Sequence, residues 1–143
     1  MRLKPSLVLS LLAMLLLNTG CEVATDVTLQ GGNPPVFVLS GSGEVLGFGI
    51  CRSAESTGQK SPCVWEIKPR ESPRDYASKL GKITYGEVPK GYIQVTPPSG
   101  ATAPALSPGT RYEFSVTTQN APHAYGSFEI RDGKAVLVGS IRH

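Results

Sequence analysis

The stretch Leu106–Val116, LSPGTRYEFSV, carries the clearest strand pattern of the chain. A Pro-Gly turn leads into a run in which apolar and polar residues alternate strictly. Tyr112, Phe114 and Val116 fall on one side of this run, and polar residues fall on the other. Because successive side chains of a strand point to opposite faces, the pattern predicts a half-buried β-strand over 111–117.

Two further strands are predicted on the C-terminal side of this stretch. The segments 125–131 and 134–141 flank Asp132-Gly133. Both residues of such a dipeptide tolerate positive φ, which a two-residue hairpin turn requires. The C-terminal part of the chain is therefore expected to be a hairpin.

On the N-terminal side, the segment 97–109 contains four prolines and two glycines in thirteen residues. Proline cannot donate to a strand ladder, so a surface loop is expected here, with a polyproline binding surface as the alternative. Short strands are predicted at 82–87 and 91–96 around Pro89. They form either a hairpin or a crossover between two sheets.

The first half of the chain adds more strand patterns. They cover 27–29, 36–40, 45–51 and 63–68. In the third of these, Leu46, Phe48 and Ile50 are expected to share one face. One helix is predicted over 72–80, since serine can cap its start, proline suits its first position and Gly81 can end it.

Short strands separated by turn signals, with almost no helix, favour an all-β fold. The economical architecture is a single antiparallel β-sandwich over 27–143 with one short helix.

The segment Leu106–Val116 also resembles the tyrosine corner of fibronectin type III domains, in which a Leu-x-Pro-Gly-Thr-x-Tyr segment leads into the penultimate strand. The resemblance implies an Ig-like or fibronectin-like sandwich. It also implies that Tyr112 buries its ring while its hydroxyl bonds the backbone of the preceding loop. Trp65 would match the core tryptophan of an early strand.

The N-terminus has the pattern of an export signal: two basic residues, then the uncharged apolar run Leu7–Leu17. This run is too short to span a membrane, which takes about 20 apolar residues. The sequence Leu17-Asn18-Thr19-Gly20-Cys21 (LNTGC) resembles the lipobox of bacterial lipoproteins, which implies cleavage after residue 20 and acylation of Cys21. An ordinary signal peptide with an unmodified Cys21 is the alternative.

By this resemblance, 1–20 are a signal peptide, 21–26 a short acylated linker, and the protein is held in the membrane by the acyl chains on Cys21. Glu22 after the cysteine implies, as in enteric lipoproteins, the periplasmic face of the outer membrane. The segments 32–37 and 85–89 also resemble small bacterial lipoproteins, a resemblance that implies location and no activity.

Two cysteines remain once Cys21 is assigned to lipid, and an even pair in an exported chain indicates a disulfide between Cys51 and Cys63. A redox or metal-binding pair is the alternative. The spacing is neither C-x-x-C nor that of a zinc site, and the histidines lie far away, so no metal or cofactor is predicted.

Charge gives no indication of a nucleic-acid partner. Loss of the signal would remove 20 of 143 residues and two of 14 basic residues, and the remaining 123 would carry 12 basic and 11 acidic residues, a formal charge of +1. Nucleic-acid-binding domains are strongly basic or cluster their basic residues on one face. No nucleic-acid binding is therefore predicted.

The sequence favours a non-enzymatic module of the cell envelope that binds a protein or glycan. Its acidic residues are scattered, and its candidate general base, His123, lies in a loop-like run. The candidate binding surface consists of Tyr85, Pro89, Tyr92 and Tyr125, with packing in the sheets as the alternative for each tyrosine. A structural accessory subunit held through a sheet edge, and a hydrolase using His123, are the other candidate functions.

Overall fold

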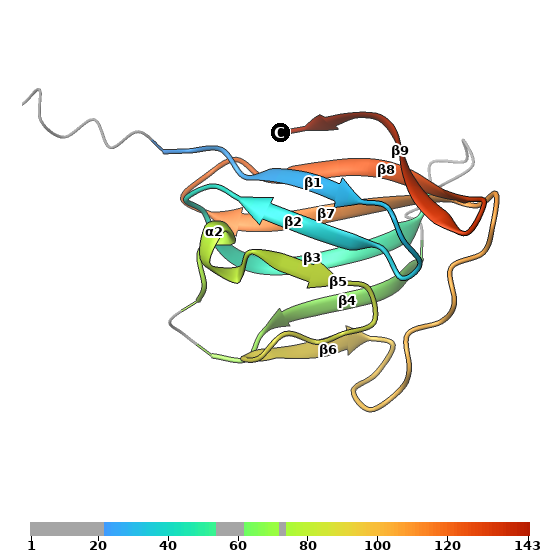
Figure 1. Ribbon diagram of the computed structural model, residues 1–143. Helices are drawn as coiled ribbons and strands as arrows, with labels where there is room; N and C mark the ends of the chain where they lie inside the picture. Colours follow the sequence, from blue (N-terminus) through green and yellow to red (C-terminus); the bar gives the residue numbers. More distant parts are fainter. Residues whose placement is uncertain (1–21, 54–61, 72–73) are drawn as a thin grey trace, which may run out of the picture.

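The computed structural model describes residues 22–53, 62–71 and 74–143 (Figure 1). The described elements are β1 (Asp26–Gln30), β2 (Val36–Ser40), β3 (Glu44–Arg52), β4 (Cys63–Pro69), α2 (Ala77–Leu80), β5 (Lys82–Thr84), β6 (Tyr92–Thr96), β7 (Arg111–Gln119), β8 (Ala124–Arg131) and β9 (Lys134–Arg142). Within these ranges, no helix has the length and apolar character needed to cross a membrane.

The strands form two antiparallel sheets packed face to face. The smaller sheet has the order β1-β2-β5 and the larger one the order β6-β4-β3-β7-β8-β9. Figure 1 shows the smaller sheet in front of the larger one. The predicted all-β antiparallel sandwich with one short helix is therefore confirmed.

An aromatic cluster joins the two sheets. The ring of Phe37, on β2, lies 4.9 Å from that of Phe48, 5.2 Å from that of Phe114 and 5.7 Å from that of Phe128. All four side chains are at most 2% exposed. Burial of one such side chain contributes about 1.5–3 kcal/mol relative to exposure, so these four rings are a substantial part of what holds the two sheets together.

The corner before β7 has the contact that the fibronectin-like motif implies. Tyr112 is buried and stacks on Phe128 with 5.6 Å between ring centroids. Its hydroxyl accepts a hydrogen bond from the Ser107 N–H at 2.9 Å, which ties the preceding loop to the strand. Trp65, on β4, is also fully buried, and its indole N–H donates to Gln94 Oε1 at 2.9 Å.

The connection from β5 to β6 is a crossover between sheets and not a hairpin. Strand β5 ends at Thr84, before the end of the predicted range 82–87, because a turn follows. The Glu87 N–H donates to the Thr84 carbonyl at 3.1 Å, and Gly86 takes a φ of 82° that favours glycine. The chain then enters the larger sheet at Tyr92.

The proline-rich segment 97–109 contains no strand, as predicted. It is anchored by Leu106, which is buried, and by the Pro104 carbonyl, which accepts a hydrogen bond from the Tyr85 hydroxyl. Neighbouring strands lie about 4.8 Å apart, so the six-stranded sheet is wider than the three-stranded one. The smaller sheet therefore cannot cover the whole inner face of the larger sheet. This loop therefore supplies part of the cover.

Strand β3 departs from the predicted alternation at one residue. Its pairing with β7 shifts between Val45 and Gly47, so an extra residue stands on β3 at this point. Val45 and Phe48 are buried, while Leu46 is only half-buried. The prediction that Leu46 shares a face with Phe48 and Ile50 is wrong, because a bulge turns that side chain away from the core.

Helix α2 is shorter than the predicted 72–80. The first two residues of that range, with their predicted cap, lie outside the described residues, and the helix begins at Ala77. The Ala77 N–H donates to the Gly43 carbonyl at 2.9 Å, so the turn between β2 and β3 satisfies a donor that a helix start leaves free. Gly81, with a φ of 71°, ends the helix as predicted.

Candidate functional site

The four residues predicted as a binding surface do not form one. Tyr85 is 7% exposed and Tyr92 5% exposed, whereas Tyr125, on β8, is 38% exposed. Pro89 is half-buried in the loop before β6. Of these four residues, Tyr125 alone has an exposed aromatic ring, so the four do not make one continuous surface.

Burial governs the chemistry of Tyr85 and Tyr92. The Tyr85 ring lies 5.4 Å from the Trp65 ring in an edge-on arrangement. The pKa of Tyr85 is raised to about 12, mainly by burial and to a smaller extent by the neighbouring Tyr112. Burial and the negative charge of Asp75 raise the pKa of Tyr92 to about 12. Both hydroxyls therefore stay neutral near neutral pH.

The outer face of β7 and β8, which points away from the smaller sheet, carries an ordered set of polar side chains. We name it the outer ladder. Its pairs across the two strands are Arg111 with Glu129, Glu113 with Ser127 and Ser115 with Tyr125. The alternation of β7 predicted which of its residues face outward. Their partners on β8 became known only from the register.

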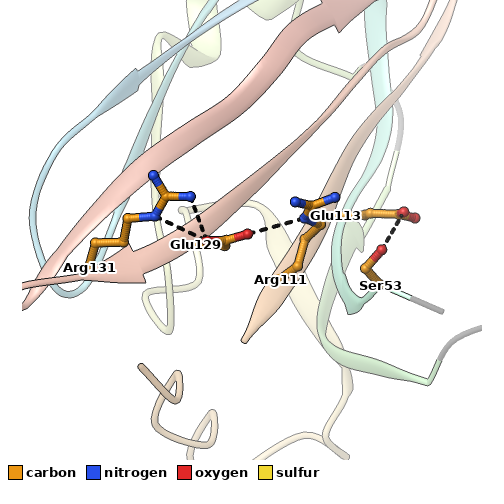
Figure 2. Close-up of polar contacts among 5 residues, drawn as sticks. All are labelled: Ser53, Arg111, Glu113, Glu129 and Arg131. Carbon is orange, nitrogen blue, oxygen red and sulfur yellow. Dashed lines mark hydrogen bonds and ion pairs between the residues drawn. The ribbon is translucent and has the colours of Figure 1, made fainter. Parts of the chain in front are cut away.

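Figure 2 shows the charged end of the outer ladder. Glu129 lies between two guanidinium groups, with Arg111 Nε 3.2 Å from its Oε1 and Arg131 Nη2 2.8 Å from its Oε2. Hydrogen bonds from Arg131 and then Arg111 lower the pKa of Glu129 below its ordinary value of 4.5. Beside this group, the Ser53 hydroxyl donates to Glu113 Oε1 at 3.0 Å.

The other end of the outer ladder borders a groove of about 220 Å³, which we name the Tyr125 groove. The guanidinium carbon of Arg142 lies 5.0 Å from the centre of the Tyr125 ring. Gly126 also lines the groove, and an added Cβ there would stand 2.8 Å from the Phe114 ring. A glycine at this position therefore lets β8 lie close to the core beneath the groove.

The predicted disulfide is confirmed and borders the same groove. Cys51 and Cys63 are joined across β3 and β4, where the register pairs them. Cys51 lines the Tyr125 groove together with Glu113 and Ser115. The bridge thus fixes the edge of the groove contributed by β3.

The histidine considered for catalysis has a structural contact. His123 Nδ1 accepts a hydrogen bond from the Thr118 N–H at 3.0 Å, which closes the turn between β7 and β8. In the part of the chain that the structure describes, no group of three or more histidine, cysteine, aspartate or glutamate side chains is arranged to hold a metal ion.

The predicted lipidation residue, Cys21, lies outside the described residues, and the segment after it is bound to the domain. The Val23 N–H donates to Ser42 Oγ at 2.9 Å, and the Ser42 N–H donates to the Val23 carbonyl at 3.1 Å. Thr25 is fully buried, with its hydroxyl 3.3 Å from that of Thr118. The predicted linker 21–26 is corrected, since Val23 and Thr25 are bound to the domain and β1 begins at Asp26.

Comparison with known proteins gives no match, whether to a family model, to a curated protein or to a solved structure.

Proposed function

We propose that this protein is a lipid-anchored, non-enzymatic module of the cell envelope that binds an envelope protein or glycan through the outer ladder and the Tyr125 groove. The observation that carries the binding role is the exposed Tyr125 ring beside Arg142, at the end of an ordered row of charged and hydroxyl side chains. Tyrosine and arginine are the residues on which binding energy concentrates at interfaces.

The outer ladder is organised before any partner arrives. Glu129 is held by Arg111 and Arg131, and Glu113 by Ser53. Side chains that are already fixed lose less conformational entropy on binding, a cost of about 0.5–1.5 kcal/mol per side chain. The strands beneath them are rigid elements of the core, so the surface suits recognition of one partner shape.

The anchor rests on the lipobox resemblance at Cys21, and by that resemblance the location is the periplasmic face of the outer membrane. Mass spectrometry of the purified N-terminus tests it directly. We expect a mass that includes acyl chains in the parent and their loss, with release from membranes, in Cys21→Ser. A mature parent chain that carries an unmodified cysteine would refute the anchor.

The binding surface is tested by affinity capture from solubilised envelopes and by a glycan array, with parent and variants compared. Tyr125→Ala should weaken capture at least about tenfold, equivalent to about 1.4 kcal/mol. Tyr76→Ala is the matched control, since Tyr76 is also half-exposed but lies beside α2. Equal capture by both variants, or no partner in either assay, would contradict the proposal.

A structural accessory role is the second candidate, and one observation favours it. Val136 and Leu137, on the terminal strand β9, are each 37% exposed at the edge of the larger sheet. Exposed strand edges pair with other chains through their backbones, and lysine on an edge opposes such pairing. If this role is correct, Leu137→Lys will abolish partner capture and Tyr125→Ala will leave it unchanged.

A further inference from the structure

The segment that follows Cys21 leaves little freedom between the proposed lipid and the domain. Val23 is fixed to Ser42 by hydrogen bonds in both directions. The backbone at Gly41 also packs closely against Ala24, because a Cβ added at Gly41 would stand 2.6 Å from the Ala24 carbonyl oxygen. Two residues of extended chain reach about 7 Å. Acyl chains on Cys21 would therefore enter the bilayer beside Val23.

The surface at this point is apolar and hollow. Val23 and Tyr76 are the two most exposed large apolar side chains of the described residues, at 58% and 50%. They line a groove of about 600 Å³ with Gly41, Ser42 and Ser78. Of the two cations near Tyr76 in sequence, Lys79 is paired with Asp75 at 2.9 Å and Arg74 donates to Gln119 Oε1 at 2.8 Å, and Glu22 adds one negative charge. The apolar side chains therefore dominate the chemistry of this surface.

We infer, on the basis of the proposed lipid anchor, that this surface, lined by Val23, Gly41, Ser42, Tyr76 and Ser78, rests on the bilayer and takes lipid at the boundary between headgroups and acyl chains. Tyrosine suits this boundary because its ring is apolar and its hydroxyl stays hydrated. The chain between the proposed acyl chains and Val23 is short, so this surface stays close to the bilayer. Lipid is therefore the partner we propose for it.

This contact sets the orientation of the whole domain. Tyr76 forms a bridge with Glu44, which pairs with Gln119 at the end of β7. Arg111 stands at the opposite end of this nine-residue strand, about 26 Å away at about 3.3 Å per residue. The charged end of the outer ladder is therefore held away from the bilayer, where a partner can reach it.

The test uses full-length protein, purified with its native N-terminus and reconstituted in vesicles of phosphatidylethanolamine and phosphatidylglycerol with brominated acyl chains. Bromine quenches tryptophan fluorescence at short range. Tyr76→Trp and Val23→Trp report on the proposed membrane surface. Val136→Trp is the matched control, since Val136 is exposed and pairs with Glu129 at the far end. The buried Trp65 is common to all samples and is subtracted using the parent.

We expect quenching of Tyr76→Trp and Val23→Trp to exceed that of Val136→Trp by roughly threefold or more, since only the former lie at lipid depth. Acylated protein that floats with the vesicles but shows equal quenching at all three positions would overturn the orientation and leave the anchor intact. A chain without acyl groups that does not float would overturn both. Higher salt should leave the quenching ratio unchanged, because the contact is apolar.

Discussion

At the scale of single residues, three buried tyrosines differ in what their hydroxyls contact. Tyr112 accepts a hydrogen bond from the Ser107 N–H, and Tyr85 donates to the Pro104 carbonyl. Tyr92 Oη is buried and has no hydrogen-bond partner among the residues that the structure describes. A buried polar group with a partner contributes a little to stability, whereas one without a partner costs its desolvation.

This difference predicts that removing the hydroxyl, by a Tyr→Phe substitution, destabilises the protein at two of these positions and not at the third. Tyr112→Phe and Tyr85→Phe should each lower the free energy of unfolding by about 1 kcal/mol, since each leaves a backbone group without its partner. Tyr92→Phe should cause no loss and a gain of up to about 1 kcal/mol. Chemical denaturation of the three variants measures this. A loss in Tyr92→Phe equal to that in Tyr85→Phe would show that its hydroxyl has a partner.

Glu129 gives a prediction for acid stability. Two arginines lower its pKa below 4.5 in the folded protein, so it binds a proton less readily there than in the unfolded chain. Its stabilising effect is therefore complete above about pH 4.5 and is lost as the pH falls through the lowered folded-state pKa. As the pH falls through this range, Glu129→Gln should lose less stability than the parent loses, as measured by denaturation curves at each pH.

The matched control for this experiment is Glu113→Gln. Glu113 lies on the same face but accepts its hydrogen bond from the neutral Ser53 hydroxyl. We expect it to keep most of the parent's acid dependence. The same acid dependence in Glu129→Gln and the parent would mean that the two guanidinium groups do not stabilise this carboxylate.

At the scale of elements, β3 and β7 hold the larger sheet together. Strand β3 pairs with both β4 and β7, and the disulfide adds a covalent link from β3 to β4 beyond Ile50. The bulge at Leu46 and the turn at Gly41 shape the opposite end of β3, where α2 docks. The two ends thus serve different purposes, with one bordering the Tyr125 groove and the other supporting the proposed membrane surface.

The disulfide should stabilise the fold without determining it. Cys51 and Cys63 are 12 residues apart, and closing a loop of this size in the unfolded chain is worth about 3 kcal/mol. We expect the Cys51→Ser/Cys63→Ser double variant to lose about this much in chemical denaturation and to keep its β-sheet circular dichroism. Reductant should destabilise the parent equally and leave the double variant unchanged. A double variant that is unfolded in buffer would contradict this prediction.

At the scale of the whole molecule, the sandwich separates two surfaces. The groove beside Val23 and Tyr76 lies at one end of β7, and the charged end of the outer ladder lies at the other. If the lipid anchor and the outer ladder work as proposed, the length of one strand keeps the bilayer and the partner apart. The domain then needs no flexible linker, which agrees with the packing of Val23 and Thr25 against it.

The sequence alone determined the features that depend on local patterning. The alternation of 111–117, the Asp132-Gly133 turn and the pairing of Cys51 with Cys63 follow from side-chain periodicity, positive φ and cysteine arithmetic, and all three are present. The contact made by Tyr112 followed from a motif of eleven residues. The strand, turn and corner signals lie within a few residues of their effects, and the cysteine pair follows from the small number of cysteines, so none of them requires knowledge of the tertiary neighbours.

Only the tertiary structure decided which side chains face solvent and which come together. Tyr85, Tyr92 and Tyr125 look alike in sequence, but two are buried because the crossover and the loop 97–109 cover them. The pairing of Arg111 with Glu129 depends on the register between strands, and the bulge at Leu46 depends on the partner β7. The physical reason is the same in each case, since burial and pairing are set by residues distant in the chain, and the sequence period of a strand does not encode them.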